Sequence, residues 1–403
     1  MRTLLAAALA ALIVAPAAFT QDKKEPPKKT EPTLKVGDPA PKFVADKWLQ
    51  GGPVDRFENG KVYVVEFWAT WCGPCIAMMP HLADMAEEYK AKGVTVIGFS
   101  STAQDQIDKA EKFVGKRGPK LGYNFAWGTT DATHTAWMKA ANQGGIPCSF
   151  VVNKEGKIAY IGHPLFLDIV LPQVLAGTWD PVKGAADMEA ADKDFDKAYE
   201  ASQNKDAAAG QKAMDEILAA RPSFADVPYL LSPRLELLIK NKRFADAQKI
   251  GEKSVAKAAK RDDVSALRTV RQAFLADAAK GEKELVALAV KAAEMDREVT
   301  GADDAGATIR LASAYVAAGD EKAKKLAAEG VTLAEKALKG DKDWQGQLLL
   351  ATAHDAAGDK AAAKSAGEKA VAAGGENPGL KKYILEQVKK YGVEEPKEEK
   401  KDK

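Results

Sequence analysis

The chain contains two different patterns of apolar positions, and the first of them alternates short apolar runs with longer amphipathic stretches. The runs predict buried strands, over Val62–Ala69, Val94–Ser100, Tyr123–Trp127, Cys148–Asn153 and Lys157–Gly162. The stretches between and after them predict helices, over Cys75–Lys92, Asp105–Lys116, Ala132–Asn142 and Leu167–Ala176. The turn residues Lys154-Glu155-Gly156 join the last two strands into a hairpin. This order of elements is typical of a compact α/β domain.

The second pattern, from about Ala185 to Tyr391, is rich in Ala, Lys, Glu and Leu and has almost no strand signals. Turn residues recur in it at intervals of roughly 38–39 residues, at Asn204-Lys205, Asn241-Lys242, Gly281-Glu282, Gly319-Asp320 and Gly358-Asp359. A regular period of this size predicts stacked helical hairpins, an all-α solenoid. Small residues stand where tetratricopeptide repeats have them, at Ala351, Gly358, Ala363 and Ala370. The period exceeds the usual 34 residues, so the region is predicted to be tetratricopeptide-like.

The N-terminus has the features of an export signal. Arg2 supplies the positive end, Leu4–Val14 is a short apolar core, and Ala15-Pro16-Ala17 offers small residues for cleavage. The charged, proline-rich stretch that follows is typical of a disordered linker. The predicted organisation is a signal peptide (1–20), a linker (21–33), an α/β domain (34–182), helical repeats (185–392) and a charged disordered tail (393–403).

The composition and charge of the chain exclude some classes of function. The 403 residues are 46% hydrophobic and 29% charged, with a net charge of +2, so no excess of basic residues indicates a nucleic-acid partner. An exported protein meets conditions in which disulfides persist. Yet the chain has only three cysteines, Cys72, Cys75 and Cys148. It is therefore expected to act on the disulfides of other proteins rather than to depend on its own.

Cys72 and Cys75 lie where a predicted strand gives way to a predicted helix. Helical residues three apart have Cβ atoms about 5–6 Å from each other, close to the separation that a disulfide needs. The start of a helix stabilises a thiolate, so Cys72 is predicted to attack disulfides and Cys75 to resolve the mixed disulfide. The alternative is half of a structural zinc site. The chain offers no second CxxC pair and no histidine next to this one, so the sequence favours redox chemistry.

The segment Val65-Glu66-Phe67-Trp68-Ala69-Thr70-Trp71-Cys72-Gly73-Pro74-Cys75 resembles the active site of the thioredoxin superfamily. Thr70 and the following Met79-Pro80-His81-Leu82 resemble its exported TlpA/ResA-like branch. The resemblance covers about residues 34–182. It implies a thioredoxin-like fold, with a central sheet flanked by helices, and thiol-disulfide oxidoreductase activity. No cofactor or metal is expected beyond the Cys72–Cys75 disulfide.

Other residues of this chain match positions that are characteristic of the same family. Glu66 stands in the place of the family's buried acid, where a raised pKa would let it take the proton of Cys75; the alternative is a strand residue that faces solvent. Pro80 matches the family's helix kink and has only a structural role. Ile146-Pro147 resembles the loop with a cis-proline that faces the redox pair. With Trp71 and Gly73-Pro74 it is predicted to bind an extended substrate chain.

Cys148 departs from the family, which usually has threonine or another small polar residue after the cis-proline. Its position suggests an accessory thiol that forms a further disulfide, is oxidised or helps to bind a metal. The alternative is a small buried side chain, since free cysteine is often buried. The four histidines, at positions 81, 134, 163 and 354, have no ligand spacing and are expected to be structural or exposed.

These features predict an exported thiol-disulfide oxidoreductase of a bacterial periplasm or cell envelope. Its substrates would be protein disulfides, an envelope electron donor would reduce it again, and the helical repeats would recruit protein partners. No stable membrane span is expected after the signal is cleaved. A peroxiredoxin would need Thr or Ser at position 69 and Pro at position 65, where this chain has Ala69 and Val65. The remaining alternative is a repeat-based interaction scaffold with an accessory or redox-sensing thioredoxin domain.

Overall fold

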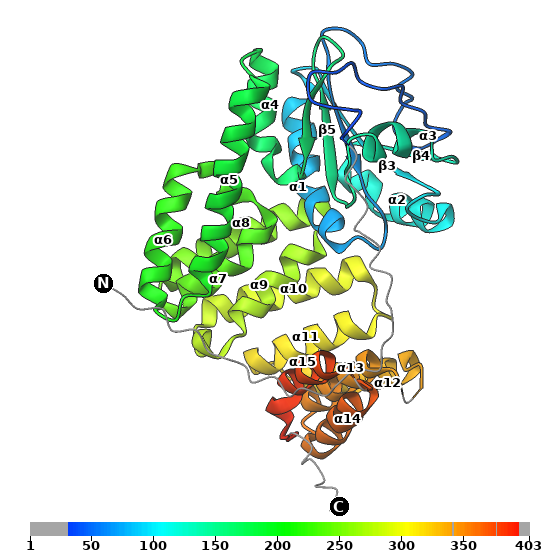
Figure 1. Cartoon of the computed structure of the whole chain (residues 1–403). Coiled ribbons are helices and arrows are strands. Elements are labelled where there is room, and N and C mark those ends of the chain that lie inside the picture. Colours follow the sequence, from blue (N-terminus) through cyan, green and yellow to red (C-terminus); the bar gives the residue numbers. More distant parts are fainter. Residues whose placement is uncertain (1–30, 341, 376, 395–403) are drawn as a thin grey trace, which may run out of the picture.

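The computed structural model describes residues 31–340, 342–375 and 377–394. A sheet with its flanking helices lies at one end of the molecule, and helical hairpins continue from it to the other end (Figure 1). The predicted signal peptide, most of the predicted linker and most of the predicted tail lie outside the described residues. Within the described part of the chain, no helix has the length and apolar character needed to span a membrane.

The sheet has six strands in the order β1-β4-β3-β2-β5-β6. The strands are β1 Lys47–Gln50, β2 Val62–Phe67, β3 Val94–Ser101, β4 Asn124–Gly128, β5 Cys148–Val152 and β6 Ile158–Gly162. The central strands β2, β3 and β4 run parallel, and β1, β5 and β6 run antiparallel to their neighbours. Every residue of β2 is buried because both faces of the sheet are covered, which explains its continuous apolar run.

Helices of the first part cover the two faces of the sheet unequally. They are α1 Gly73–Lys90, α2 Ile107–Leu121, α3 Ala132–His134 with the π-helical η1 Thr135–Lys139, the 3-10 turn η2 Pro164–Phe166, and α4 Leu167–Ala176. Residues of α1, α2 and α4 pack in one hydrophobic cluster on one face. Residues of η1 and of the N-terminal segment pack in a second cluster on the other. The predicted central sheet flanked by helices is confirmed, although the short edge strand β1 was not predicted.

The second part is helical throughout its described residues. Its helices are α5 Pro181–Ser202, α6 Ala207–Ala220, α7 Leu231–Lys240, α8 Phe244–Arg261, α9 Val264–Phe274, α10 Lys283–Thr300, α11 Ala305–Ala318, α12 Lys322–Ala337, α13 Trp344–Ala356, α14 Lys360–Ala373 and α15 Pro378–Val388. Short 3-10 turns lie between some of them, at η3 Pro222–Asp226, η4 Pro228–Leu230 and η5 Asp277–Ala279, and a further one, η6 Lys389–Tyr391, follows α15. Each of the five predicted turns lies between the two helices of a pair, from α5–α6 to α13–α14.

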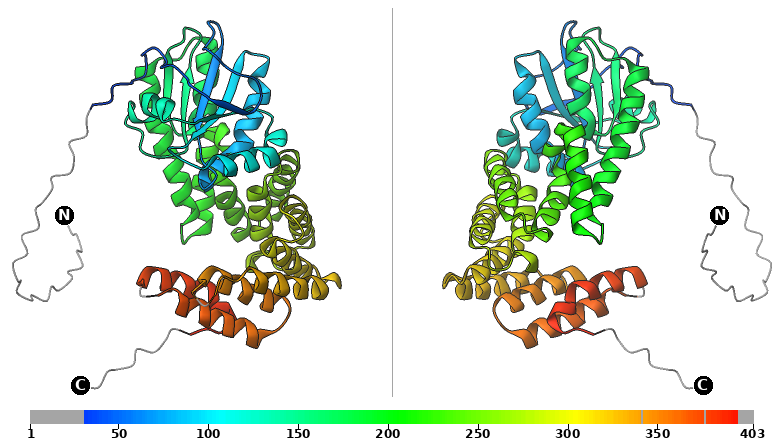
Figure 2. Two further views of the ribbon diagram at one scale, coloured as in Figure 1. Left: turned by 90° about the vertical axis from the view of Figure 1, so that its right-hand side faces the viewer. Right: turned by 90° about the vertical axis from the view of Figure 1, so that its left-hand side faces the viewer.

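The small residues of this region lie where helices meet. Ala351, Ala363 and Ala370 are fully buried. At Gly251 in α8, an added Cβ would lie 2.5 Å from the ring of Phe274 in α9, so only glycine allows these helices to approach so closely. The predicted all-α arrangement of stacked hairpins is confirmed, and Figure 2 shows the last hairpins at the end of the molecule away from the sheet.

The two parts share one hydrophobic core rather than being joined by an open linker. Buried residues of the helical region belong to the same cluster as the core under α1 and α4, among them Ala191, Met214, Phe224 and Leu230. Burying a continuous apolar surface between two units favours a fixed arrangement. The helical region is therefore a packed extension of the sheet domain at this junction.

Arg261, the last residue of α8, fixes the junction with polar contacts. It is only 6% exposed, and its guanidinium donates to Asp84 Oδ1 at 2.9 Å and to the carbonyl oxygen of Lys120 at 3.0 Å. It also contacts Glu87. Because a buried guanidinium is stable only when its donors are paired, these contacts hold α8 against α1 and α2.

Candidate active site

A disulfide joins Cys72 and Cys75 at the N-terminal end of α1, with their Cα atoms 5.3 Å apart. Cys72 is the N-cap residue of the helix, and the backbone N–H of Cys75 donates to its sulfur at 3.1 Å. Both cysteines are buried, whereas the neighbouring Trp71, Gly73 and Pro74 are exposed. The predicted pairing at a helix start is confirmed. An amide donor and the positive end of the helix both favour a negative charge on Cys72 Sγ once the disulfide is reduced.

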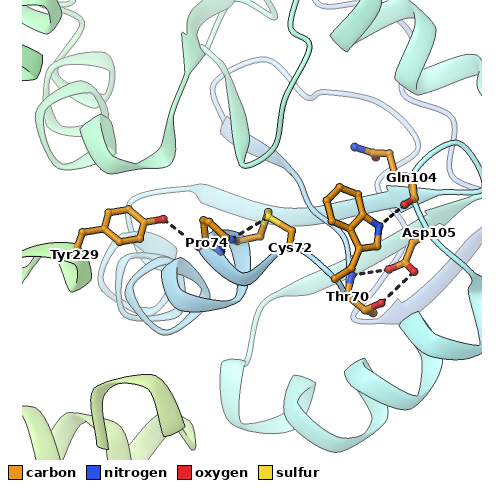
Figure 3. The surroundings of a disulfide bond; sticks show 8 residues. Thr70, Cys72, Pro74, Gln104, Asp105 and Tyr229 are labelled. Atoms are coloured by element: carbon orange, nitrogen blue, oxygen red, sulfur yellow. Dashed lines mark hydrogen bonds between the residues drawn. A yellow bond between two sulfur atoms is a disulfide. The ribbon is translucent and has the colours of Figure 1, made fainter. Parts of the chain in front are cut away.

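The segment before the disulfide is held by the loop that follows β3 (Figure 3). Asp105 accepts two hydrogen bonds from Thr70, one from its backbone N–H at 2.5 Å and one from its hydroxyl at 3.0 Å. The indole N–H of Trp71 donates to the carbonyl oxygen of Gln104 at 2.7 Å. Parallel strands β2 and β3 end at the same edge of the sheet, so the residues after them meet there. Asp105 was not predicted as a site residue, although its place after a buried strand was a usable signal.

Glu66 lies inside the sheet, 2% exposed. Its neighbours Val64 and Trp68 belong to the same cluster as the disulfide, and since side chains alternate along a strand, Glu66 faces that side too. The hydroxyl of Ser149 donates to one carboxyl oxygen, and the other has no hydrogen-bond partner among the described residues. Loss of hydration raises the pKa of Glu66 to about 8. The prediction of a buried acid is confirmed and the solvent-facing alternative is wrong.

The Ile146–Pro147 peptide bond is cis, as the family resemblance predicted. Both residues are partly exposed and come directly before β5. Cys148 at the start of β5 pairs with Phe67 at the end of β2, and the two strands are antiparallel. The chain before β5 therefore lies at the same edge of the sheet as the residues after β2, which brings the cis-proline loop and the redox pair together.

Cys148 lies on the other face of the sheet from the redox pair. It is 1% exposed and packs in the cluster that contains Phe67, Trp137 and Phe150. Burial raises the pKa of the Cys148 thiol, and its sulfur lies 4.0 Å from Gln143 Oε1. Because reactive cysteines are thiolates with access to solvent, these surroundings favour the packing role over that of an accessory thiol.

The helical region also reaches the active site. The hydroxyl of Tyr229, in η4, donates to the carbonyl oxygen of Pro74 at 3.0 Å (Figure 3). Its ring lies 5.8 Å from the ring of His163, which follows β6. Sequence reasoning missed Tyr229 because it is 155 positions from Pro74, and no local pattern links the two.

A metal centre needs several ligating side chains close together. Within the described ranges, no group of three or more His, Cys, Asp and Glu residues is placed to hold a metal ion. His81 is buried in α1 and its Nε2 lies 2.7 Å from a carboxylate oxygen of Asp168 in α4, so this histidine joins two helices. The sulfur atoms of the CxxC pair are bonded to each other in this oxidised form.

Known proteins match the first part of the chain, which carries the disulfide. The family model Redoxin matches residues 35–165. Protein FixW of Rhizobium leguminosarum is 32% identical over 152 residues, which are 36% of this chain and 69% of FixW. The thiol-disulfide oxidoreductase ResA of Bacillus thuringiensis (strain Al Hakam) is 32% identical over 127 residues, 31% of this chain and 68% of ResA.

Among solved structures, a putative thiol:disulfide interchange protein DsbE from Chlorobium tepidum aligns with 36% of this chain and 99% of its own, at 24% identity and a TM-score of 0.28. The family match spans the segment that carries the disulfide, Glu66 and the cis-proline loop. The chain belongs to the TlpA/ResA-like branch of the thioredoxin superfamily, and its first part is a thioredoxin-like oxidoreductase.

Proposed function

We propose that this protein is an exported enzyme that reduces or exchanges disulfides in protein substrates through Cys72 and Cys75. The observation that carries the proposal is the disulfide at the N-terminus of α1, with an amide donor on Cys72 Sγ and exposed residues on both sides. A redox pair in this setting opens and closes with little movement of the backbone. The buried sulfur of Cys75 is suited to the second step of the exchange.

In the reducing direction, the Cys72 thiolate attacks one sulfur of the substrate disulfide. A bond forms between Cys72 Sγ and that sulfur, the substrate S–S bond breaks, and the second substrate sulfur leaves as a thiolate that takes a proton from solvent. Cys75 then attacks Cys72 Sγ, which re-forms the Cys72–Cys75 disulfide and releases the first substrate sulfur. Two electrons and two protons pass to the substrate in total.

Glu66 is proposed to take the proton of Cys75 in the second step. A base is effective when its pKa is close to that of the group it deprotonates. Glu66, with a pKa of about 8, is closer to a free thiol, about 8.5, than an ordinary carboxyl is. Its unpaired carboxyl oxygen is buried on the face of the sheet that carries α1. In the opposite direction of electron flow, the same carboxyl would return the proton.

The substrate surface is proposed to consist of Trp71, Gly73-Pro74 and Ile146-Pro147. Trp71 is 67% exposed while its indole N–H is held by Gln104, so it presents a fixed apolar face beside the nucleophile. The backbone before β5 lies next to the redox pair and is partly exposed. An extended peptide has free backbone groups that can pair with it there.

Export to the periplasm or another part of the cell envelope rests on the predicted signal peptide. In an oxidising compartment the Cys72–Cys75 disulfide needs an outside supply of two electrons for each turnover. A dithiol protein of the envelope is the class of donor that can supply them by the same exchange reaction.

The helical hairpins are proposed to be tetratricopeptide-like repeats that recruit protein partners. The alternative function is a scaffold in which the repeats bind partners and the thioredoxin-like part senses redox state. The contact of Tyr229 with the active-site loop supports an enzyme in which both parts act together. A Cys72→Ser, Cys75→Ser variant that fully rescued a deletion strain would favour the scaffold.

The test is a trap for mixed disulfides. The Cys75→Ser variant, which keeps Cys72, should accumulate substrate proteins linked through Cys72 when expressed with its export signal. Non-reducing gels and mass spectrometry would identify the linked peptides. Cys72→Ser should trap far less, and Cys148→Ser is the matched control that should turn substrates over as the parent does. Capture at Cys148 instead of Cys72 would contradict the proposal.

A further inference from the structure

A groove of about 360 Å³ lies where the end of β6 meets the first helix of the helical region. Both parts of the chain build it. Its lining includes Ile161, Gly162, His163, Phe166, Met188 and Asp192. The first four follow or belong to β6 and η2, and the last two lie on α5.

The groove adjoins the active site. Gly162 in β6 pairs with Ser149 in β5, one residue after Cys148 and two after the cis-proline. On the other side, the ring of His163 lies 5.8 Å from Tyr229, which donates to Pro74 of the active-site loop. The groove therefore lies next to the cis-proline strand and next to the Tyr229 contact of the active-site loop, within reach of a polypeptide segment bound across Pro74 and Pro147.

The chemistry of the groove is apolar with an acidic rim. Ile161, Phe166 and Met188 supply apolar surface. Asp192 is exposed on α5, and its carboxylate faces His163 across the groove closely enough to act on that ring by its charge, without a hydrogen bond or ion pair to a described residue. The neighbouring acid, Glu189, is paired with Lys193 at 2.6 Å. Burial lowers the pKa of His163, so that ring carries no compensating positive charge at neutral pH. The free carboxylate of Asp192 is therefore the charge that a bound segment meets.

We propose that this composite groove seats the part of the substrate that flanks its disulfide, and that it selects an extended segment with an apolar side chain followed by a lysine or arginine. The apolar side chain would lie against Met188 and Phe166, and the cation would pair with Asp192. This inference rests on the proposed function, since it names the substrate class of the same site. It also assigns to the helical region a direct part in substrate choice, beyond the recruitment of partners at a distance.

The experiment uses the fully reduced protein and two oxidised peptides of equal length, each with one disulfide and a leucine near it. The peptides differ only in the next residue, lysine in one and glutamate in the other. Rapid mixing under single-turnover conditions, followed by tryptophan fluorescence or quenched-flow gels, gives a second-order rate constant for each. The ratio of the two constants, lysine over glutamate, is the readout.

The parent protein should reduce the lysine peptide about three- to tenfold faster, and this preference should shrink as salt is added because the pair is exposed. Asp192→Asn should bring the ratio close to one, and Asp192→Lys should reverse it. The reversal is a gain of preference that a misfolded protein cannot produce. Asp187→Asn is the matched control, because Asp187 lies on the same helix but does not line the groove.

Suppose that the parent protein reduces the two peptides at equal rates and that Cys72→Ser abolishes both reactions. This result would contradict substrate selection by the groove, while the proposed oxidoreductase activity would stand. A preference that survives in Asp192→Lys would also contradict that selection. Failure of the parent to reduce either peptide would contradict the proposed function itself.

Discussion

The two thiol environments of this molecule lie on opposite faces of one sheet and differ in almost every physical respect. Cys72 and Cys75 begin a helix, with an amide donor on the first sulfur and a buried acid, Glu66, on their side of the sheet. Cys148 packs among aromatic rings on the other side, where burial raises the pKa of its thiol. Yet Cys148 directly follows the cis-proline that lies near the redox pair.

The difference shows that the face of a strand matters more than closeness along the chain. Successive side chains of β5 point to opposite faces, so Cys148 and Ser149 have different neighbours. Ser149 donates to Glu66 and belongs to the active-site side. A cysteine at position 149 would have been placed among the active-site groups, whereas at 148 it is part of the packing.

The largest expected effect comes from removing the nucleophile. Cys72→Ser should lower the rate of disulfide reduction by about a thousandfold or more, because a serine hydroxyl is a far weaker nucleophile than a thiolate. Insulin reduction with dithiothreitol as the electron source measures it. If the variant kept a tenth of the parent activity, the nucleophile would have to be another residue, and the contrast between a reactive Cys72 and a packed Cys148 would be wrong.

Glu66→Gln should slow the release of mixed disulfides about a hundredfold, since general acid–base catalysis has that size. Release can be followed by stopped flow from a preformed mixed disulfide at Cys72. The initial attack by Cys72 should be much less affected, and Asp168→Asn, a change in another carboxyl that contacts α1, is the matched control. Equal slowing of both steps would argue against a role in the second one.

The same substitution should also change how stability depends on pH. The pKa of Glu66 is about 8 in the folded protein, above its ordinary value of 4.5. Between these values the folded state keeps a proton that the unfolded state has lost, so the free energy of unfolding falls as pH rises. The fall should reach about 3 kcal/mol by pH 7. Urea unfolding should show about 2.5 kcal/mol of this fall between pH 5 and pH 7 in the parent, and Glu66→Gln should remove most of it.

Arg261→Ala should lower the free energy of unfolding by about 2 kcal/mol, because the buried guanidinium pairs with Asp84 and with backbone carbonyls. The loss should loosen α1, and hydrogen exchange should rise there rather than around Cys148. Lys260→Ala, which removes an exposed neighbour on the same helix, is the control and should leave stability unchanged. Equal increases in exchange on both faces of the sheet would show that the junction does not act on α1 in particular.

Cys148→Ala should have the smallest effect, a loss of about 1 kcal/mol in stability from the missing sulfur and no change in disulfide reduction. Thermal unfolding and the insulin assay measure the two quantities. A fall in activity at unchanged stability would instead support the predicted accessory thiol.

Much of the fold could be predicted because its signals are local. The apolar run of β2 and the turn residues between paired helices each reflect a short stretch of chain. The edge strand β1 has only four residues and none of them is fully buried, so it gave no clear apolar signal. The orientation of Cys148 could have been worked out from the alternation within its predicted strand.

The parts of the site that escaped prediction depend on distant pairs. Tyr229 and Arg261 contact the thioredoxin-like part only because the helical region packs against α1, and a sequence pattern does not contain that packing. Asp105 is a contact that could have been predicted in part. It follows β3 and Thr70 follows β2, and residues after two neighbouring parallel strands lie close together. Long-range contacts of this kind require the structure.

The most direct test of the account is the order in which the three thiols react. The reduced, folded protein would be treated with iodoacetamide at pH 7 and sampled over time, with each cysteine followed by peptide mass spectrometry and a urea-unfolded sample as the reference. Cys72 should be alkylated first, Cys75 much more slowly, and Cys148 only after the protein is unfolded. Alkylation of Cys148 in the folded protein at a rate close to that of Cys72 would contradict it.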